Sequence, residues 1–421
     1  MHYVIIGNSA AGIGAVEGIR KVDSDNPITI ISDEPYHTYS RPLISYYLAG
    51  KVSKEKMIYR KKEFYNQNRV EPLLGIKATK IDVTGKRVEL ENGEAVSYDR
   101  LLIATGSKPF VPPVDGLDKE RVFTFLKLDD VEKIKEVARP GAKAVIIGAG
   151  LIGLKAAEAL GLLGVQVTVV ELADRVLSAI LDGEAAAIVQ QHLERQGICF
   201  ELNTTAQKIH GEKQVTGVTL QNGKELTCDF LIIAIGVRPN IDLVEGTPVK
   251  VDRGIIVNEK MQTNVADIYA AGDVAQGFDI VYGQQRLIPI LPGAYKQGET
   301  AGLNMAGKEV TYPGGFAMNS IGFFGLPMIT AGIVNPEGEG YEVITLSQPE
   351  HQNYKKIILK EDRLVGFICL NKVDRAGILT SLINDQINVG PFKEALIRED
   401  FGYIYFPESV RKSRMLSGGV A

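Results

Sequence analysis

The amino-acid sequence contains two copies of one unit, separated by 130 residues. Residues 88–106 and 218–236 align without gaps, and 9 of the 19 positions are identical. Each copy has an Asn-Gly pair, which predicts a β-hairpin, followed by an aspartate and an apolar strand that ends at a glycine. A repeat of this length predicts two related units, each with its own sheet.

Each copy also begins in the same way, with an apolar strand, a glycine turn and a helix. The two openings are YVIIGNSAAGIG at 3–14 and AVIIGAGLIGL at 144–154. The second contains a complete G-x-G-x-x-G pattern, whereas the first has serine in the middle position. In such turns the first glycine allows the tight bend, the second lets the backbone approach a pyrophosphate, and the third lets the helix pack on the strand. The helix N-terminus attracts the phosphates. Both units therefore predict dinucleotide binding.

An acidic residue follows the second strand of each copy. Glu171 ends the strand at 165–170, while Asp33 follows the strand at 27–31, with Glu34 as a second candidate. A carboxylate in this position accepts hydrogen bonds from both ribose hydroxyls and repels a 2′-phosphate, so Glu171 favours NAD over NADP. Arg175 nearby is the opposing feature, since an arginine there could contact a phosphate.

A third signal, TNVADIYAAGDVA at 263–275, follows the second copy. We expect it to return to the first unit, so that the second unit is inserted in the first. The predicted domains are 1–115 with 246–311, then 116–245, then 312–421. The Gly272-Asp273 pair after a strand can hold a sugar hydroxyl, and Asp273 is also expected to cap a helix.

Charge and cysteine content exclude several classes of function. The 421 residues carry a net charge of −4, which gives no general attraction to nucleic acid or anionic membranes. Cys199, Cys228 and Cys369 are far apart, and without any C-x-x-C pattern they predict neither a local metal cluster nor a close disulfide pair. All three are expected to be buried strand residues. No targeting segment or long apolar run is recognisable, so we expect a cytoplasmic protein with no membrane contact and no metal.

Four ordered motifs carry a family resemblance: GNSAAG at 7–12, IATGSKP at 103–109, GAGLIG at 148–153 and YAAGD at 269–273. Together they resemble the pyridine nucleotide–disulfide reductase superfamily of flavoproteins. The segment TYSRPLISYYLAG at 38–50 is similar to NADH:rubredoxin reductases and to the flavin module of nitrite reductases. Flavin subunits of NAD-dependent aldehyde and 2-oxoacid oxidoreductases are also similar. The resemblance implies an α/β protein with two Rossmann-like, three-layer ββα domains, one inserted in the other, and a C-terminal α+β interface domain.

The resemblance also implies roles for individual residues. The first unit would bind FAD, with Gly7, Ser9 and Gly12 at the pyrophosphate and Asp33 or Glu34 at the ribose. Ala78 would contact the adenine, Arg41 the pyrophosphate or flavin, and Asp273 the ribitol. The other residues expected at this site are Ala11, Pro42, Ala104, Thr105, Gly106 and Gly272. The second unit would bind NAD(H) through Gly148, Gly150, Leu151, Ile152, Gly153, Glu171 and Gly236.

Two departures from the family pattern are informative. Related disulfide reductases and NADH oxidases carry cysteine just after the second strand, but residues 1–198 of this chain contain none. Thiol chemistry beside the flavin is therefore not expected. Related reductases also pair a lysine with a glutamate near the flavin, and the matching positions here are Tyr46 and Lys155. We hypothesise that Lys155 is a catalytic residue whose charge stabilises reduced flavin; alternatively, it is an ordinary lysine facing solvent.

The favoured function is an FAD-dependent oxidoreductase that exchanges hydride with NAD(H) and single electrons with an iron–sulfur protein or subunit. Residues 310–336, which include Phe316, Phe323 and Phe324, are a candidate docking surface or else part of the domain core. Two alternatives stay open: a cysteine-independent NADH oxidase that uses oxygen, and a non-catalytic NAD-binding flavoprotein.

Overall fold

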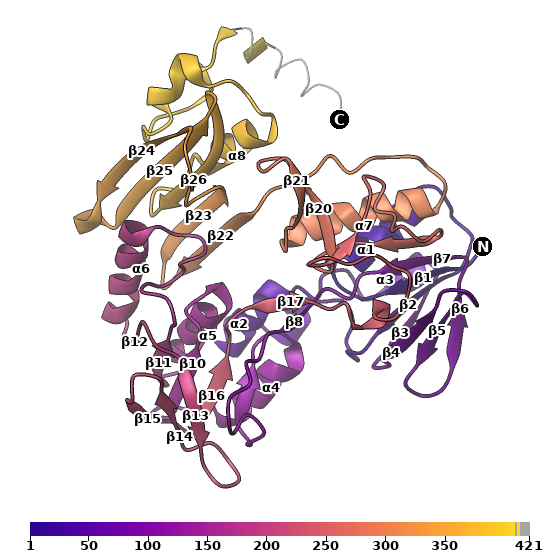
Figure 1. The fold of residues 1–421 in the computed structure, drawn as a ribbon, viewed down its shortest axis with the longest axis horizontal. Coiled ribbons are helices and arrows are strands. Elements are labelled where there is room, and N and C mark those ends of the chain that lie inside the picture. Colours follow the sequence, from indigo (N-terminus) through magenta and orange to yellow (C-terminus); the bar gives the residue numbers. More distant parts are fainter. Residues whose placement is uncertain (409–410, 413–421) are drawn as a thin grey trace.

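The computed structural model describes residues 1–408 and 411–412 (Figure 1). Two related α/β units and a C-terminal domain follow one another around the molecule. The end of the predicted C-terminal domain, residues 413–421, lies outside the described part. Within that part, no helix is long and apolar enough to cross a membrane.

The first unit is built on a parallel sheet with the strand order β19-β7-β1-β2-β3. The central strand β1 pairs on both sides, with Ile5 opposite Ile30 and Leu102. Because both faces of the sheet are covered, all four residues of β1 are buried, which explains the unbroken apolar run. The strands are β1 (Tyr3–Ile6), β2 (Ile28–Ser32), β3 (Val70–Leu74), β7 (Arg100–Ile103) and β19 (Ile268–Ala270).

Two helices cover one face of this sheet, and a small antiparallel sheet covers the other (Figure 1). The layers contain α1 (Ala10–Arg20), α7 (Leu291–Met305), β4 (Ala78–Asp82), β5 (Arg87–Leu90) and β6 (Ala95–Ser97). Smaller elements of this unit are η1 (Arg41–Leu43), α2 (Ile44–Leu48), η2 (Lys54–Met57), α3 (Phe64–Gln67), β18 (Ile255–Ile256), β20 (Ala275–Asp279) and β21 (Gln284–Leu287).

The second unit repeats the same plan, with the strand order β12-β11-β10-β16-β9 and a three-stranded sheet β13-β14-β15. Even the register irregularity is repeated, between Ala78 and Lys80 in one small sheet and between Ala206 and Lys208 in the other. The elements are β9 (Val122–Thr124), α4 (Leu128–Val137), β10 (Lys143–Ile147), α5 (Leu151–Leu162), β11 (Gln166–Val170), α6 (Gly183–Arg195), β12 (Cys199–Glu201), β13 (Ala206–His210), β14 (Gly217–Leu220), β15 (Glu225–Thr227) and β16 (Phe230–Ile233). The short helix η3 (Asp242–Val244) follows this unit in the sequence and packs into the core of the first unit, where Val244 is buried.

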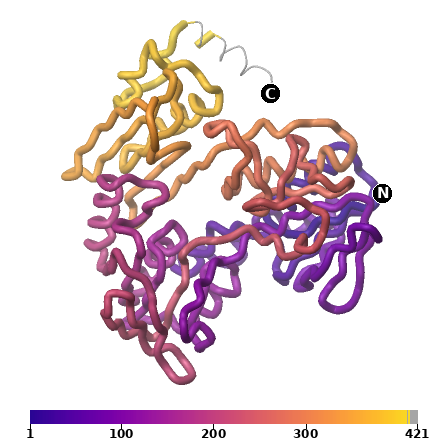
Figure 2. The backbone as a smooth tube through the Cα atoms, viewed as in Figure 1, coloured from indigo at the N-terminus to yellow at the C-terminus, as the bar shows by residue number. Residues whose placement is uncertain are grey.

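Two short antiparallel strands connect the units. β8 (Ser107–Pro109) leaves the first unit and β17 (Val237–Pro239) leaves the second, and they pair with Ser107 opposite Pro239. The chain then returns to the first sheet, where β19 pairs with β7. Figure 2 shows this return as the orange-red part of the trace beside the indigo N-terminal part. The return of residues 263–275 follows the prediction, while the residue boundaries of the three domains stay a prediction.

The C-terminal domain is an antiparallel sheet with the order β22-β23-β26-β25-β24. One face packs against the second unit, where Phe323 and Tyr354 join a core cluster that includes residues of α5 and α6. The other face packs against a helix and the following loops. The elements are β22 (Met318–Phe323), β23 (Leu326–Gly332), β24 (Tyr341–Gln348), η4 (Pro349–His351), β25 (Asn353–Lys360), β26 (Arg363–Leu370), α8 (Ala376–Asn384), η5 (Gly390–Ala395) and η6 (Tyr403–Tyr405). The predicted fold class is confirmed.

Some of the glycine content serves a close contact between α1 and α7. A Cβ atom added to Gly14 or Gly18 would lie 2.3 or 2.5 Å from a backbone oxygen of α7. In the opposite direction, a Cβ on Gly298 or Gly302 would lie 1.9 or 2.2 Å from a backbone oxygen of α1. Side chains at these positions would force the helices apart, so four glycines are needed here for packing rather than for turns.

Candidate cofactor-binding sites

The glycine turns of both units are packed so closely that their first and third glycines cannot carry a side chain. In the first unit, a Cβ on Gly7 would lie 2.0 Å from the Ala104 carbonyl oxygen, and one on Gly12 would lie 2.0 Å from the Gly7 oxygen. In the second unit, a Cβ on Gly148 would lie 2.4 Å from the Ala234 oxygen. Both turns are therefore fixed by contacts within the protein, as the motif predicts.

The middle position of each motif is different, because it begins a helix. Gly150 is the N-cap of α5, and no described atom lies within 4 Å of a Cβ built on it. Ser9 is the N-cap of α1, and neither residue gives its helix a side-chain cap. The first N–H groups of both helices, including those of Leu151 and Ile152, are thus free of side-chain caps. This donor set fits a pyrophosphate.

The two candidate ribose acids of the first unit have different surroundings. The Asp33 side chain is 47% exposed, and its carboxylate lies 2.6 Å from Lys127 Nζ. The Glu34 side chain is only 6% exposed, forms an ion pair with Arg41 and accepts a hydrogen bond from Tyr39 Oη at 2.6 Å. Both residues lie just after β2, so both stay candidates.

Arg41, at the start of η1 and next to Pro42, is held in place by its ion pair with Glu34. Its guanidinium also donates to the Leu126 carbonyl oxygen at 3.3 Å. Burial by itself would lower the pKa of Arg41, but the neighbouring Tyr39 and Glu34 outweigh it and raise the pKa. Tyr39, which the sequence analysis did not single out, thus helps to fix a cationic group at this end of the sheet.

Asp273 lies beyond β19 in a polar cluster that spans both parts of the first unit. Its carboxylate accepts a hydrogen bond from Ser107 Oγ at 3.1 Å, and burial raises its pKa. The preceding Gly272 donates its N–H to Gln297 Oε1 of α7 at 2.8 Å, and a Cβ there would lie 3.1 Å from the Ala11 Cβ. A partly buried carboxylate with hydrogen-bonding capacity fits a polyol hydroxyl. The expected helix cap at Asp273 is wrong, because strand β20 follows it.

The remaining residues predicted for FAD lie at the ends of strands. Ala78 is buried at the start of β4, and Ala104 is buried just after β7. Thr105 Oγ1 donates to the Asn240 oxygen at 2.7 Å, and Asn240 N–H donates to the Gly106 oxygen at 2.9 Å. This segment therefore connects the end of the first sheet to the strand that returns from the second unit.

The acid of the second unit is bonded directly to its glycine turn. The Glu171 carboxylate accepts hydrogen bonds from the Ala149 N–H at 2.6 Å and the Ala173 N–H at 2.9 Å. Arg175 lies close by in sequence and pairs with Asp174 at 2.8 Å. Gly236, at the other end of the unit, has a φ of +115° and accepts a hydrogen bond from the Phe110 N–H. The structure thus brings Glu171 to the turn that the sequence pairs with it.

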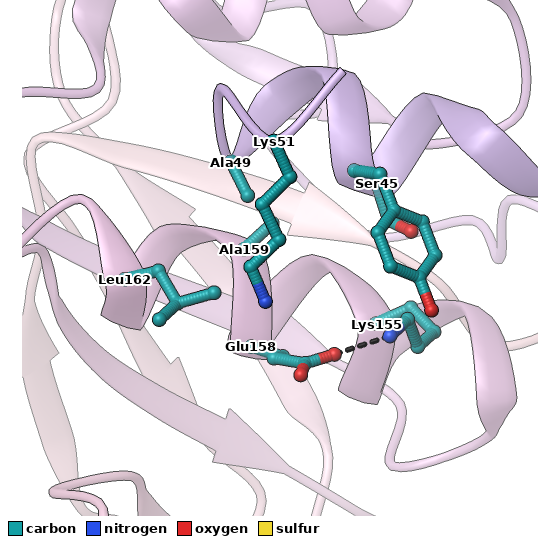
Figure 3. Close-up of a pocket in the computed structure, with 8 residues that line it drawn as sticks. Ser45, Ala49, Lys51, Lys155, Glu158, Ala159 and Leu162 are labelled. Carbon is teal, nitrogen blue, oxygen red and sulfur yellow. Dashed lines mark hydrogen bonds and ion pairs between the residues drawn. The ribbon is translucent and has the colours of Figure 1, made fainter. Parts of the chain in front are cut away.

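Lys155 is a mostly buried residue, not an ordinary lysine facing solvent, so that alternative is wrong. Its side chain is 12% exposed and forms an ion pair with Glu158 one turn further along α5 (Figure 3). The ammonium also donates to the Gly322 oxygen at 3.2 Å and lies 4.7 Å from the centre of the Tyr46 ring. Burial follows because the tip of the β22–β23 hairpin covers this part of α5.

Glu158 is the main residue of this cluster that the sequence analysis missed. Its other carboxylate oxygen accepts a hydrogen bond from the Phe324 N–H at 2.8 Å. The pair of Lys155 and Glu158 therefore binds the backbone of one hairpin tip at two points, Gly322 and Phe324. The sequence does contain a signal for this pair, because Lys155 and Glu158 are opposite charges spaced three residues apart on a helix.

The structure corrects the expectation for one cysteine and decides between the two interpretations of part of the aromatic segment. Cys228 and Cys369 are buried, but Cys199 is exposed because it begins β12, the edge strand of its sheet. All three thiols are free.

In the segment 310–336, Phe316 and Phe323 are buried, so these two belong to the core rather than to a docking surface.

Comparison with known proteins decides the family. The family model described as pyridine nucleotide-disulphide oxidoreductase matches residues 1–298, well over half of the chain. The chain belongs to this family. A second model, the rubredoxin NAD+ reductase C-terminal domain, matches residues 318–387 and begins with β22.

Individual relatives agree with this assignment. The chain is 32% identical over 402 residues to the NADH-dependent phenylglyoxylate dehydrogenase subunit epsilon of Aromatoleum evansii, and the match covers 94% of both chains. It is 32% identical over 388 residues to the NAD(P)H nitrite reductase of Bacillus subtilis, covering 92% of this chain but only 47% of that relative. The chain thus spans about half the length of the nitrite reductase.

A solved structure extends the similarity to the whole architecture. The NADH:rubredoxin oxidoreductase from Clostridium acetobutylicum matches with a TM-score of 0.75 and 28% identity, over 93% of this chain and 97% of that one. As a member of the family, the chain is a flavoprotein oxidoreductase that binds FAD and NAD(H). Its two glycine turns, its uncapped helix N-termini and its partly buried Asp273 fit these cofactors.

Proposed function

We propose that this chain is an FAD-containing NADH:acceptor oxidoreductase that exchanges single electrons with an iron–sulfur protein or subunit. The observation that carries the proposal is the combination of two dinucleotide turns with an N-terminal part, residues 1–198, that contains no cysteine. A bound flavin exchanges hydride with NAD(H) and single electrons with a metal centre. Without a thiol in this region, electrons have to pass to a partner or to a small acceptor, and no redox-active disulfide takes part.

The chain's own groups bind and orient the two cofactors. In this proposal Gly7, Ser9 and the N-terminus of α1 hold the FAD pyrophosphate, and Asp273 accepts a ribitol hydroxyl. Gly150 and the N-terminus of α5 hold the pyrophosphate of NAD(H), and Glu171 accepts its ribose hydroxyls. Fixed donors and charges of this kind need no reorganisation during the reaction, which is how a protein accelerates chemistry that belongs to a cofactor.

The type of partner is supported by the relatives. The C-terminal domain matches a rubredoxin reductase domain, and the relative matched along 94% of its length is named as a subunit of a dehydrogenase. Both point to an electron-transfer protein as the other reactant, either a small rubredoxin-like or ferredoxin-like protein or a subunit of a larger complex. The direction of electron flow follows from the potentials of the partners.

Anaerobic stopped-flow spectroscopy of the FAD-loaded protein tests this proposal. NADH is expected to bleach the flavin absorbance within seconds, and oxidised rubredoxin or ferredoxin is expected to restore it faster than air-saturated buffer does. Alkylating the exposed Cys199 should change neither rate. Absence of bleaching would favour the non-catalytic binding protein, and equally fast reoxidation by air would favour the oxidase.

Lys155 is proposed to keep a positive charge beside the reacting rings. Lys155→Met is expected to slow flavin reduction by NADH roughly tenfold and to make the flavin potential more negative, because the positive charge stabilises reduced flavin. A tenfold change in rate corresponds to about 1.4 kcal/mol of activation free energy. Lys155→Arg should retain most of the rate. The measurements are the bleaching rate and a reductive titration.

Lys51 offers a matched control for this prediction. Its ammonium lies 6.0 Å from the same Tyr46 ring, but the residue is exposed, so Lys51→Met should leave rate and potential unchanged. A double variant, Lys155→Met with Glu158→Gln, removes the buried carboxylate that the single change leaves unpaired. If the double variant regains the wild-type rate, the charge of Lys155 has no role in hydride transfer.

A further inference from the structure

The C-terminal domain contains a cleft that none of the predicted cofactor sites uses. It has a volume of about 360 Å³, within the usual range for small-molecule sites. The cleft lies beside β24, β25 and β26 at the start of α8, on the sheet face turned away from the second unit. Its lining consists of Leu346, Asn353, Lys355, Cys369, Lys372, Asp374, Arg375, Ala376, Leu379 and Glu399.

Lys355 on β25 is the buried charged residue of this lining. It is 8% exposed, and its ammonium donates to the Arg398 carbonyl oxygen at 3.1 Å. Among the described residues, no carboxylate oxygen lies within 4.0 Å of it. An ammonium has three donors, and a buried charge is costly unless it is paired. Burial accordingly lowers the pKa of Lys355, although Glu399 acts in the opposite direction.

The adjacent lysine on the same strand has a carboxylate partner and therefore provides a comparison. Lys356 points to the opposite face of the sheet, where its ammonium lies 2.8 Å from Asp182 of the second unit. Two consecutive buried lysines on one strand therefore have different environments. One has a carboxylate partner within the chain, and Lys355 has a cleft in front of it.

The lining of the cleft carries more positive than negative charge. Lys372 and Arg375 are exposed there, and Arg375 is the N-cap of the nine-residue helix α8. Two carboxylates, Asp374 and Glu399, are also part of the lining, and Glu399 accepts a hydrogen bond from Asn353 Nδ2 at 3.4 Å. Three cations against two carboxylates leave the lining with a net positive charge. The helix N-terminus adds to that potential.

We propose that this cleft binds a small molecule carrying a carboxylate or phosphate group, with Lys355 as the buried ligand and Lys372 and Arg375 at the entrance. Leu346, Ala376 and Leu379 supply an apolar wall for the carbon part of the ligand. The site is separate from both dinucleotide turns, so it does not depend on the proposed electron-transfer function.

Pyridoxal 5′-phosphate is a suitable probe, because it joins an aldehyde to a phosphate. The Lys355 amine adds to the aldehyde carbon, a C=N bond forms and water leaves; borohydride then delivers hydride to that bond and makes the product stable to peptide mapping. On the FAD-loaded protein, labelling of Lys355 is expected to saturate with probe concentration and to exceed labelling of the exposed Lys360. Inorganic phosphate or malonate should slow it about fivefold.

Variants of the rim separate a binding site from a merely reactive lysine. Lys372→Ala and Arg375→Ala leave Lys355 in place but should each slow its labelling about threefold, since each removes one attractive charge. Lys360→Ala makes the same change of charge outside the cleft and should have no effect. Preference for phosphate over malonate as competitor assigns a phosphate ligand, and the reverse assigns a carboxylate. Labelling that neither saturates nor responds to either anion overturns the proposal.

Discussion

Gly153→Ala is expected to unfold the second unit, whereas Gly150→Ala leaves the fold intact and weakens NADH binding. A Cβ on Gly153 would lie 2.0 Å from the Gly148 carbonyl oxygen and 3.1 Å from its carbon, so α5 would have to move away from β10. Forced displacement of packed backbone costs about 3 kcal/mol or more, a large fraction of the stability of a domain.

The second substitution has no such cost, because a Cβ on Gly150 meets no described atom within 4 Å. Its backbone, with φ −78° and ψ −177°, is also acceptable to alanine. The added methyl group instead occupies the space that a pyrophosphate needs. We expect the apparent affinity for NADH to fall at least about tenfold, which corresponds to about 1.4 kcal/mol, while the melting temperature stays within a few degrees.

Thermal unfolding of the FAD-loaded protein and NADH titration of flavin bleaching measure the two effects separately. Gly183→Ala is the matched control: it lies in the same unit, at the start of α6, and a Cβ there also meets nothing within 4 Å. It should change neither stability nor affinity. If Gly150→Ala binds NADH with wild-type affinity, this turn does not bind the pyrophosphate.

The repeated plan of the fold could be predicted because its signals are local. A strand, a glycine turn and a helix occupy about a dozen consecutive residues, and the packing around Gly7 and Gly148 is set by atoms of the same unit. The acid after each second strand is also local, so Glu171 and the pair Asp33 and Glu34 could be predicted as candidates from spacing alone. The order of the strands then follows from the usual rules of parallel sheets.

Contacts between distant segments could not be predicted in this way. Lys155 is covered by a hairpin tip that lies 167 residues further along the chain, so its burial has no local signal. The exposure of Cys199 depends on β12 being the edge of its sheet, which requires the complete strand order. Likewise, the glycines of α1 and α7 are in contact although the two helices lie near opposite ends of the sequence that forms the first unit. In each case a second segment, unknown from the local sequence, decides the environment.

Asp182→Ala is expected to loosen the contact between the second unit and the C-terminal domain. The Asp182 carboxylate caps α6 through the Ala185 N–H at 3.0 Å, and it accepts hydrogen bonds from Tyr354 Oη at 2.6 Å and Lys356 Nζ at 2.8 Å. The Lys356 and Asp182 side chains are 10% and 20% exposed. Removing one partner of a mostly buried pair costs about 3–5 kcal/mol, and losing the cap costs about 1 kcal/mol more.

Urea unfolding measures this loss, and a pair elsewhere in the C-terminal domain provides the control. Glu342→Ala removes the partner of Lys393, a far more exposed pair at 2.7 Å, and should change the unfolding midpoint very little. An equal loss of stability in both variants would mean that the position of Asp182 between the two domains has no special importance.

The acid dependence of the Asp182 contact gives an independent check. Burial by itself would raise the pKa of Asp182, but hydrogen bonds from Lys356 and Tyr354 outweigh it and hold the pKa below the ordinary value of 3.8. A carboxyl whose pKa is lower in the folded state stabilises the fold fully above its unfolded pKa, and this stabilisation is lost as the pH falls through the folded pKa. The stability difference between wild type and Asp182→Asn should therefore be constant near neutral pH and shrink below about pH 4. A difference that stays the same down to pH 3 would show that the charge on Asp182 contributes nothing to the contact.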